Sequence, residues 1–395
     1  MPLKILHVIR SVNPAGGGPV EGLKQMAAAN IARGHHIEVV TLDAPDAPWV
    51  GSCPLKTHAL EAGLGGYGYS GKLVPWLRAH HQNYDAVVVD GIWQYHAFAV
   101  WRALRKTGKP YFVFTHGMLD PWFKRAYPLK HLKKWLYWPW ADYRVLRDAA
   151  AVLFTCEEER LLARQSFWLY RCRERVVNFG TAGPPPGDAE ARRSLFAQRW
   201  PETEGKRCLL HLGRVHVKKA PDLVLKAFAH ELAELPSAEA AARHLIMAGP
   251  ADNAYGVEMQ TLAISLKLAG KVTWTGMITG DLKWGAYYQS EAFLLPSHQE
   301  NFGIVVAEAL ACGRPVLISN KINIWREIEA DGAGLIETDD LPGTQRLLRR
   351  WRDLPVQARA EMGIRATQCF RQRFHIDRSA ESLIEALTEP RLKSS

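Results

Sequence analysis

Residues 4–42 read KILHVIRSVNPAGGGPVEGLKQMAAANIARGHHIEVVTL, and this stretch decides the fold. It opens with an apolar, β-branched run from Lys4 to Val12, which predicts a buried strand. After a glycine cluster, Val20–Arg33 carries apolar residues at helical spacing and ends before Gly34, a residue that suits a helix C-cap. A second apolar run, Ile37–Leu42, follows. This order predicts a βαβ unit with a glycine-rich first turn.

Short apolar runs recur along the chain at intervals that leave room for helices, as in parallel sheets buried on both faces. In the first half they are Ala86–Val89, Tyr111–Thr115 and Ala150–Thr155. In the second half they are Cys208–Leu212, Leu245–Ala248, Val272–Thr275, Ala292–Leu295, Pro315–Ile318 and Gly334–Ile336, with a helix expected at Pro221–Leu235. We therefore expect an α/β protein with two Rossmann-like domains facing a central cleft.

The proline-rich stretch 184–190 is the expected linker, because three consecutive prolines suit neither a helix nor a central strand. A length of 395 residues favours two domains. We expect an N-terminal, acceptor-side domain at 1–183 and a C-terminal, nucleotide-sugar-binding domain at 191–371.

Composition narrows the class of protein. Hydrophobic residues make up 47% and charged residues 23%, as in ordinary globular proteins. The N-terminus has no signal-peptide pattern, and no run of about 18 apolar residues occurs. The six cysteines have neither C-x-x-C nor zinc spacing, which favours free thiols in a reducing compartment. We expect a cytoplasmic protein whose net charge of +10 favours nucleic acid, an anionic membrane or a phosphorylated ligand.

The most informative segment is residues 296–316, PSHQENFGIVVAEALACGRPV. A strand should stop before Pro296, and a helix should run from near Phe302 to Gly313. Glu300 then lies just outside the helix start, and Glu308 lies roughly 9 Å along its axis. A helix N-terminus suits a diphosphate, so a nucleotide-sugar laid across it would place its sugar near Glu300 and its ribose near Glu308.

The pattern Glu300-x7-Glu308, with the EALACGRPV run that starts at Glu308, resembles the signature of the GT4 family of retaining glycosyltransferases, which have the GT-B fold. The resemblance covers nearly the whole chain and implies a donor bound mainly by the C-terminal domain. It also implies reaction on the front face of the sugar and the return of residues 372–395 to the N-terminal domain. The donor contacts it implies are Glu300, Asn301, Phe302, Gly303 and Glu308.

A second match lies at Gly213–Asp222, which is similar to the family's G-R-x4-K-G-x-D segment, with Ala220 where the family usually has Gly. The resemblance assigns Arg214 and Lys219 to the donor diphosphate. Two cations can stabilise the charge of a leaving diphosphate in place of a metal ion. Because the chain has no D-x-D motif, we expect no metal and no cofactor beyond the nucleotide-sugar substrate.

Two further matches lie in the N-terminal half. His116, in Phe114-Thr115-His116-Gly117, stands at a strand end where the family has a histidine that approaches the donor sugar. Gly16 and Gly17 resemble the family's first glycine loop, which lets the backbone approach a phosphate or an acceptor closely. We take His116, Arg214, Lys219 and Glu300 as the candidate catalytic residues.

Residues 121–150 combine seven basic and two acidic residues, a net +5, with interleaved tryptophans and tyrosines. Leu129, Leu132 and Leu136 can share one helical face. The membrane or acceptor side is expected at Lys130, Lys133, Lys134 and Trp135. Such a segment suits an anionic membrane surface and a polyprenyl-linked acceptor. A helix packed on its own domain is the alternative, and nucleic acid is not expected, because no RNA-binding motif accompanies the segment.

The sequence therefore predicts a glycosyltransferase that moves a sugar to a glycan or lipid-linked glycan, as in surface polysaccharide biosynthesis. One alternative is a nucleotide-sugar epimerase or hydrolase of GT-B fold. The other is a non-catalytic nucleotide-binding protein, against which the intact set of Arg214, Lys219, Glu300 and Glu308 argues.

Overall fold

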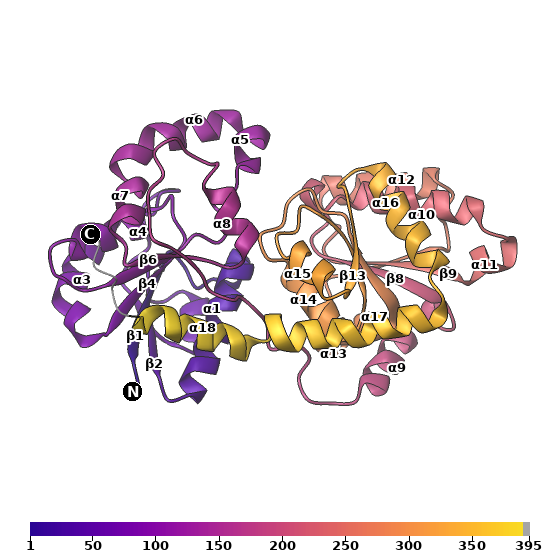
Figure 1. Ribbon diagram of the computed structural model, residues 1–395, viewed down its shortest axis with the longest axis horizontal. Helices are drawn as coiled ribbons and strands as arrows, with labels where there is room; N and C mark the ends of the chain where they lie inside the picture. Colours follow the sequence, from indigo (N-terminus) through magenta and orange to yellow (C-terminus); the bar gives the residue numbers. More distant parts are fainter. Residues whose placement is uncertain (390–395) are drawn as a thin grey trace. The chain divides into compact units, whose positions relative to one another are not determined.

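A parallel sheet organises the first part of the chain in the computed structural model, which describes residues 1–389 (Figure 1). Within these residues the strand order is β3-β2-β1-β4-β5-β6-β7. Ile5 of β1 is opposite Ile37 of β2 on one side and Ala86 of β4 on the other. The strands are β1 Lys4–Ile9, β2 His36–Thr41, β3 Lys56–Ala59, β4 Ala86–Asp90, β5 Tyr111–Phe114, β6 Ala151–Phe154 and β7 Glu174–Val176.

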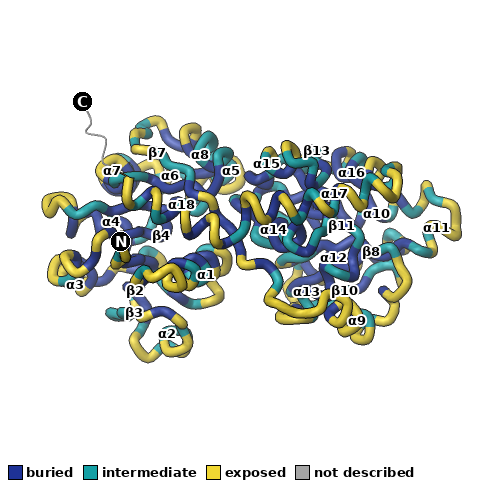
Figure 2. Tube along the Cα trace, turned by 60° about the horizontal axis from the view of Figure 1, so that its bottom comes forward, coloured by how far each residue is buried: buried dark blue, intermediate teal, exposed yellow. Residues whose placement is uncertain are grey.

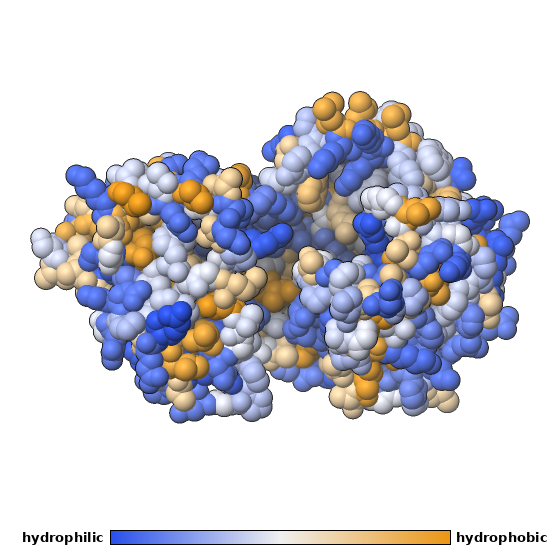
Figure 3. Space-filling model, turned by 180° about the vertical axis from the view of Figure 1, so that it is seen from behind, coloured by the Kyte–Doolittle hydropathy of each residue, from blue (hydrophilic) through white to orange (hydrophobic). Residues whose placement is uncertain are grey.

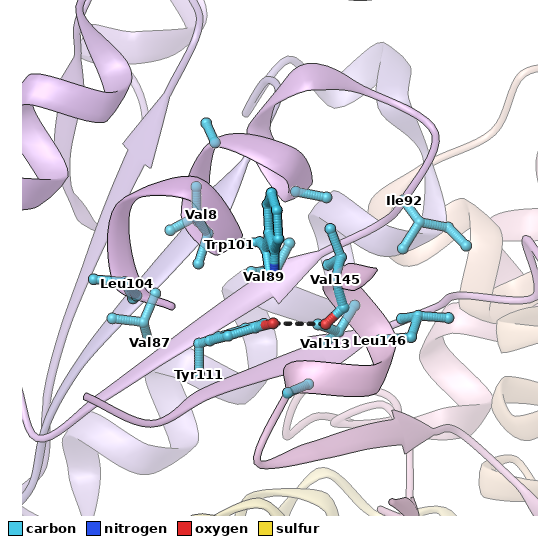
Figure 4. Close-up of a cluster of buried hydrophobic side chains, with 14 of the residues drawn as sticks. Val8, Val87, Val89, Ile92, Trp101, Leu104, Tyr111, Val113, Val145 and Leu146 are labelled. Atoms are coloured by element: carbon cyan, nitrogen blue, oxygen red, sulfur yellow. Dashed lines mark hydrogen bonds between the residues drawn. The ribbon is translucent and has the colours of Figure 1, made fainter. Parts of the chain in front are cut away.

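Helices cover this sheet and bury its apolar faces. They are α1 Gly18–Ala32, α2 Pro48–Gly51, α3 Leu73–His80, α4 Tyr95–Leu104, α5 Trp122–Ala126, α6 Pro128–Tyr137, α7 Asp142–Asp148, α8 Glu157–Ala163 and the C-terminal α18 Ile376–Thr388. Figure 4 shows part of the core, where Val87, Val89 and Val113 lie beneath Trp101 of α4 and Val145 of α7. The Tyr111 hydroxyl donates to the Val145 carbonyl at 2.7 Å, which ties β5 to α7.

A second parallel sheet has the order β10-β9-β8-β11-β12-β13 within the described residues. Its strands are β8 Arg207–Leu212, β9 Arg243–Ala248, β10 Val272–Gly276, β11 Ser290–Leu295, β12 Val316–Ser319 and β13 Gly334–Glu337. Its helices are α9 Ala189–Arg199, α10 Pro221–Glu234, α11 Ser237–Ala242, α12 Ala254–Ser265, α13 Gly280–Gln289, α14 Ile304–Ala311, α15 Trp325–Ala330, α16 Leu341–Asp353 and α17 Val356–Cys369. In both sheets the central strands are almost fully buried, as the dark blue of Figure 2 shows.

Each sheet belongs to its own structural unit. The first unit comprises Met1–Thr181 and the C-terminal segment from Ile376, and the second comprises Ala182–His375. The second unit begins before the expected linker at 184–190. Helix α9 already starts inside that stretch, because the Asp188 carboxylate caps it by accepting from the Glu190 N–H at 2.9 Å.

The C-terminal helix α18 packs on α1 of the first unit. The Ile376 N–H donates to the Thr181 carbonyl at 3.0 Å, and Arg33, the C-cap of α1, pairs with Asp377 at 3.0 Å. The return of the chain to this unit therefore starts at Ile376, four residues after the expected start at 372. Residues 390–395 of the expected 372–395 segment lie outside the described residues.

A buried carboxylate and a glycine turn explain where two elements differ from the sequence-based expectation. The first strand ends at Ile9 and not at Val12, because the Asp43 carboxylate accepts from the Val12 N–H at 2.9 Å and from the Ser11 hydroxyl at 2.6 Å. These bonds draw residues 11 and 12 out of the ladder. Helix α14 begins at Ile304 because Gly303, at φ +76°, breaks the helical path before it.

Candidate active site

Glu300 lies in the loop before α14, and the segment that follows β12 holds its backbone through two hydrogen bonds. Its N–H donates to the Lys321 carbonyl at 3.0 Å, and its carbonyl accepts from the Asn323 N–H at 3.1 Å. The left-handed Gly303 then turns the chain into the helix, and a Cβ atom there would lie 3.2 Å from the Glu300 Cγ. Strand β11, a glycine turn and α14 thus fix the Glu300 carboxylate beside the N-terminus of a helix, whose first N–H groups have no intrahelical acceptor.

Lys219 reaches Glu300 from the loop between β8 and α10. Its ammonium forms an ion pair with the Glu300 carboxylate, and both side chains are mostly buried, at 17% and 23% exposed. The neighbouring Lys218 contributes its carbonyl, which accepts from the His298 N–H at 2.8 Å. The two loops are therefore joined by a charged pair and a backbone bond.

Arg214 precedes this loop and stays apart from the ion pair. Its side chain is exposed and makes no ion pair or hydrogen bond within residues 1–389. Its backbone follows Gly213, whose carbonyl would lie 1.9 Å from a Cβ atom at position 249, so only glycine fits there. The structure brings together Lys219 and Glu300 but leaves the role of Arg214 as a prediction.

Glu308 lies on α14 and is not a surface glutamate. It is buried, and its carboxylate accepts from Lys283 Nζ at 2.7 Å and from the Tyr287 hydroxyl at 3.1 Å. Burial, and then the charge of Glu308, raise the pKa of Tyr287 well above its usual value, so Tyr287 is a hydrogen-bond donor at neutral pH. Sequence reasoning missed Lys283 and Tyr287, because no motif marks α13.

The remaining donor-side candidates surround the same turn. Asn301 accepts a long bond of 3.4 Å from the Asn323 amide. Phe302 is buried and meets Phe374 edge to face at 5.7 Å between ring centroids. Phe302 thus packs inside the unit, and a donor would meet the backbone of this turn and not the phenyl ring.

His116 belongs to the first unit, where it is held by a buried carboxylate. Its Nε2 lies 3.1 Å from Asp90 Oδ1, and His7 Nδ1 lies 2.8 Å from Asp90 Oδ2. Burial alone would raise the pKa of Asp90, but the charge of His7 and the hydrogen bond from His116 outweigh it and lower the pKa to about 2. A permanent anion at the end of β4 therefore orients both imidazoles. Asp90 was missed, although an acidic residue at the end of a buried strand was a usable signal.

A second buried carboxylate shapes the turn that carries His116. Glu159 accepts from the Thr115 hydroxyl at 2.7 Å, from the Gly117 N–H at 2.6 Å and from the Thr155 N–H at 2.7 Å. These bonds stabilise His116 at φ +47°, a left-handed conformation that costs a non-glycine residue about 1 kcal/mol or more.

The glycine loop and His116 line one pocket of about 420 Å³ in the first unit. Gly16 borders it together with Asp90, Gln94 and Met118. Gly17 caps α1 at φ +72°, and nothing lies within 4 Å of the place where its Cβ atom would stand. The structure thus brings Gly16 and His116 to one cavity, large enough for a sugar-sized group.

Two family models match the two units in turn. The description "Glycosyl transferase 4-like domain" matches residues 17–180, and "Glycosyl transferases group 1" matches residues 193–367. The chain belongs to the GT4 family of glycosyltransferases.

A D-inositol 3-phosphate glycosyltransferase from Kineococcus radiotolerans is 30% identical over 49% of this chain. The match spans 45% of that relative, so the chain aligns with less than half of its length. Among solved structures, sucrose-phosphate synthase from Thermosynechococcus elongatus has a TM-score of 0.74 at 19% identity and covers 97% of this chain and 98% of its own. Anabaena HepE in complex with UDP and glucose has a TM-score of 0.73 at 17% identity, covering 98% and 100%. These likenesses support the GT-B fold.

Ala220 departs from the GT4 pattern at a position that the structure makes demanding. It adopts φ +50° and ψ +47° as the N-cap of α10, a left-handed conformation that glycine adopts without strain. The strain lies next to Lys219, and the loop keeps it while holding that ammonium against Glu300.

The basic aromatic segment forms α5, α6 and α7 of this GT4 chain. Leu129, Leu132 and Leu136 of α6 are 79%, 56% and 62% exposed, and Trp135 is 43% exposed. The hydrophobic surface at the top of Figure 3 lies over this helix. Lys130 and Lys133 are exposed, but Lys134 turns inward, with its ammonium 4.6 Å from the centroid of the Trp93 ring. Among the lysines expected at the membrane or acceptor side, Lys134 therefore differs from Lys130 and Lys133 because it faces its own domain, which helical spacing alone did not show.

Within residues 1–389, no three His, Cys, Asp or Glu side chains gather in a way that could hold a metal ion. None of the helices in the same residues is long and apolar enough to cross a membrane.

Proposed function

We propose that this protein is a retaining glycosyltransferase that moves a sugar from a nucleotide-sugar donor to a glycan or lipid-linked glycan, without a metal ion. The observation that supports this most directly is the ion pair between Lys219 and Glu300, beside the helix that carries Glu308. Of the three side chains that the GT4 resemblance assigns to the donor, Lys219 and Glu300 lie beside the start of α14, and Glu308 lies about one turn along it.

Each donor group has a partner in this arrangement. The diphosphate would take the N–H groups at the start of α14 and the ammonium of Lys219. The ribose hydroxyls would donate to Glu308, which Lys283 and Tyr287 already hold in place. HepE is described in complex with UDP and glucose, so UDP-glucose is the first donor to test.

The reaction proposed is a substitution at the anomeric carbon. The bond from that carbon to the diphosphate oxygen breaks, the acceptor oxygen forms the new bond on the same face, and the acceptor proton passes to the leaving diphosphate. Lys219 and the helix N-terminus stabilise the charge that develops there. His116, oriented by Asp90, would donate a hydrogen bond to a sugar hydroxyl.

The test uses radiolabelled UDP-glucose, GDP-mannose and ADP-glucose, each with EDTA present. The acceptors are a membrane glycolipid extract and D-inositol 3-phosphate, the compound for which the Kineococcus relative is named. We expect label to enter an acceptor with wild type and to fall at least about a hundredfold with Glu300→Gln. Glu258→Gln, an exposed glutamate of α12, is the matched control.

Three outcomes count against the proposal. Label released as free sugar or as an epimer without acceptor would instead indicate a hydrolase or epimerase. Inverted product stereochemistry would contradict retention. Complete loss of transfer in EDTA, restored by a divalent cation, would contradict the metal-free mechanism.

We also propose that α6 attaches the protein at the inner face of an anionic membrane, where surface polysaccharides are built. Its exposed leucines form an apolar face, and Lys124, Lys130 and Lys133 supply positive charge beside it. Each lysine near an anionic surface contributes about 1 kcal/mol, screened by salt.

Vesicle co-sedimentation tests this attachment. Replacement of Leu129, Leu132 and Leu136 by Ser should abolish binding to vesicles that contain phosphatidylglycerol. The matched control is Val257→Ser with Ile264→Ser, two exposed apolar residues of α12. If the leucine variant binds such vesicles as well as wild type does, α6 is not the attachment site.

A further inference from the structure

A second pocket of the first unit lies under the inner side of α6, and no step proposed above uses it. Its volume is about 270 Å³. Trp93, Phe123 and Phe167 form aromatic walls, and Lys130, His131 and Lys134 line it from α6. We call it the Lys134 pocket. At this size it suits one sugar ring or one phosphate group better than a whole nucleotide.

Lys134 is the unusual residue of this pocket. Its ammonium lies 4.6 Å from the Trp93 ring centroid and 5.4 Å from that of Phe123. Within residues 1–389 it has no hydrogen-bond acceptor and no ion-pair partner. Burial lowers the pKa of Lys134 to about 8; the charge of Asp142 opposes this shift and that of Lys130 adds to it. Lys134 therefore remains mostly charged at pH 7. Three N–H donors of a half-buried cation thus face the cavity without an acceptor.

Two acidic groups lie near this charge. Asp142 is fully buried, and this burial raises the pKa of its carboxyl group to about 7. The hydrogen bond from the Trp93 N–H and the charge of Lys134 oppose the rise but do not cancel it. Asp120 also lines the pocket and accepts from the Trp122 N–H at 2.8 Å. Burial, with the charges of Lys124 and Lys134, lowers the pKa of His131, which is neutral at pH 7 and offers one N–H.

The pocket shares a wall with the cavity of His116. Met118 lines both, and its N–H donates to the Thr115 carbonyl at 2.9 Å within the turn that carries His116. Trp93 is held at φ +71° by its N–H bond to Asp142 at 3.1 Å and by its indole N–H bond to the Met118 carbonyl at 3.1 Å. A strained backbone, fixed at two points, therefore keeps the indole as a wall of the pocket.

We propose that the Lys134 pocket binds a phosphate or diphosphate group of the acceptor, through Lys134 and Lys130, with the aromatic walls packed against the ring or chain attached to it. The proposal deepens the proposed function and rests on it, because the acceptor would then extend past Met118 toward His116. The phosphate could belong to a lipid carrier or to a water-soluble sugar phosphate, and the two share this chemistry.

Calorimetric titration tests the proposal with four probes: glucose 1-phosphate, farnesyl diphosphate, glucose and farnesol. The phosphorylated probes should bind at least tenfold more tightly than their phosphate-free counterparts. Lys134→Met and Lys130→Met should each weaken them at least tenfold, whereas Lys106→Met, an exposed lysine after α4, should not. Because Lys130 is exposed, its variant keeps the test valid if Lys134→Met fails to fold.

The two arms identify the source of the phosphate. Tight binding of farnesyl diphosphate alone supports a lipid carrier, and tight binding of glucose 1-phosphate alone supports a soluble acceptor. Equal binding with and without phosphate, or wild-type affinity in both lysine variants, overturns the proposal. UDP binding measured in parallel separates the two hypotheses: if UDP binds and a phosphate-free acceptor is glycosylated equally well, the pocket proposal fails while the proposed function stands.

Discussion

Replacement of Glu308 by Ala is the sharpest test of the donor site, because its surroundings predict a change in binding with little change in folding. Lys283, which loses a partner 2.7 Å away, is 25% exposed and can turn to water. The Tyr287 hydroxyl, which loses a partner at 3.1 Å, keeps its bond to the Val305 carbonyl at 3.0 Å. The fold therefore retains an acceptor for the Tyr287 hydroxyl, and water supplies one for Lys283.

The loss in nucleotide affinity follows from the bonds to ribose. A hydrogen bond to a charged group contributes about 1.5–3 kcal/mol, which is roughly 10- to 150-fold in Kd. Glu308→Gln keeps an acceptor but loses the charge, so its loss should be smaller. Tyr287→Phe should have the smallest effect, because Glu308 still pairs with Lys283.

The assay is calorimetric titration with UDP, GDP and ADP, using the nucleotide that binds wild type most tightly. Glu258→Gln on α12 is the control for loss of a carboxylate, and thermal unfolding checks each variant. Unchanged affinity in a folded Glu308→Ala protein refutes the ribose assignment. A larger loss in Tyr287→Phe than in Glu308→Ala would show that Glu308 serves to hold α13 and α14 together.

Three other predictions use different measurements. Steady-state kinetics of Arg214→Ala and Lys219→Ala should show a lower kcat with a smaller rise in donor KM, because their charge matters most as the diphosphate leaves; a change in KM alone would indicate ground-state binding. In urea denaturation, the free energy of unfolding of Ala220→Gly should be no more than about 0.5 kcal/mol below that of wild type, because relief of strain offsets the greater freedom of the unfolded chain. The control, Ala227→Gly within α10, should lose about 1 kcal/mol. Equal losses in the two variants would mean that position 220 is unstrained. The pKa of Asp142 is raised in the folded state from 3.8 to about 7, so its protonated form contributes stability that is fully present below pH 3.8 and is lost as pH rises through about 7. Asp142→Asn should therefore gain stability relative to wild type between pH 5 and pH 8, and a constant difference across that range would disprove the shift.

The strands could be predicted where burial on both faces left an apolar run, as in β4 and β8. Strands β3 and β7 could not, because they are short, lie at the sheet edge and have no fully buried residue. Helix α14, which carries Glu308, was expected, but it starts later than the pattern suggested because of the turn at Gly303. Helix α13, which carries Lys283 and Tyr287, was not expected.

The candidate site was predictable only where a motif spans neighbouring residues. Glu300 and Glu308 belong to one such motif, and Lys219 to another. The partners of the site residues come from elsewhere in the chain. Lys283 is 25 residues from Glu308, and Asp90, which orients His116, also pairs with His7, which is 83 residues away from it. Neither distance leaves a local pattern in the sequence. The inward turn of Lys134 was hidden for a related reason, because a helix with leucines on one face gives no sign of which face meets its own domain.

Because Lys219 is paired with Glu300, any anion that binds this ammonium would have to compete with the Glu300 carboxylate. A free phosphate ion that approaches Lys219 must displace a carboxylate already in contact with it, and it brings no ribose for Glu308 in return. In the proposed mode of binding, a nucleotide-sugar would also have to displace this carboxylate, but it would gain bonds at the helix N-terminus and at Glu308. In a cell rich in inorganic phosphate, this ion pair would reduce occupation of the site by free phosphate. Lys219 would exchange Glu300 for a diphosphate only when a complete nucleotide-sugar binds.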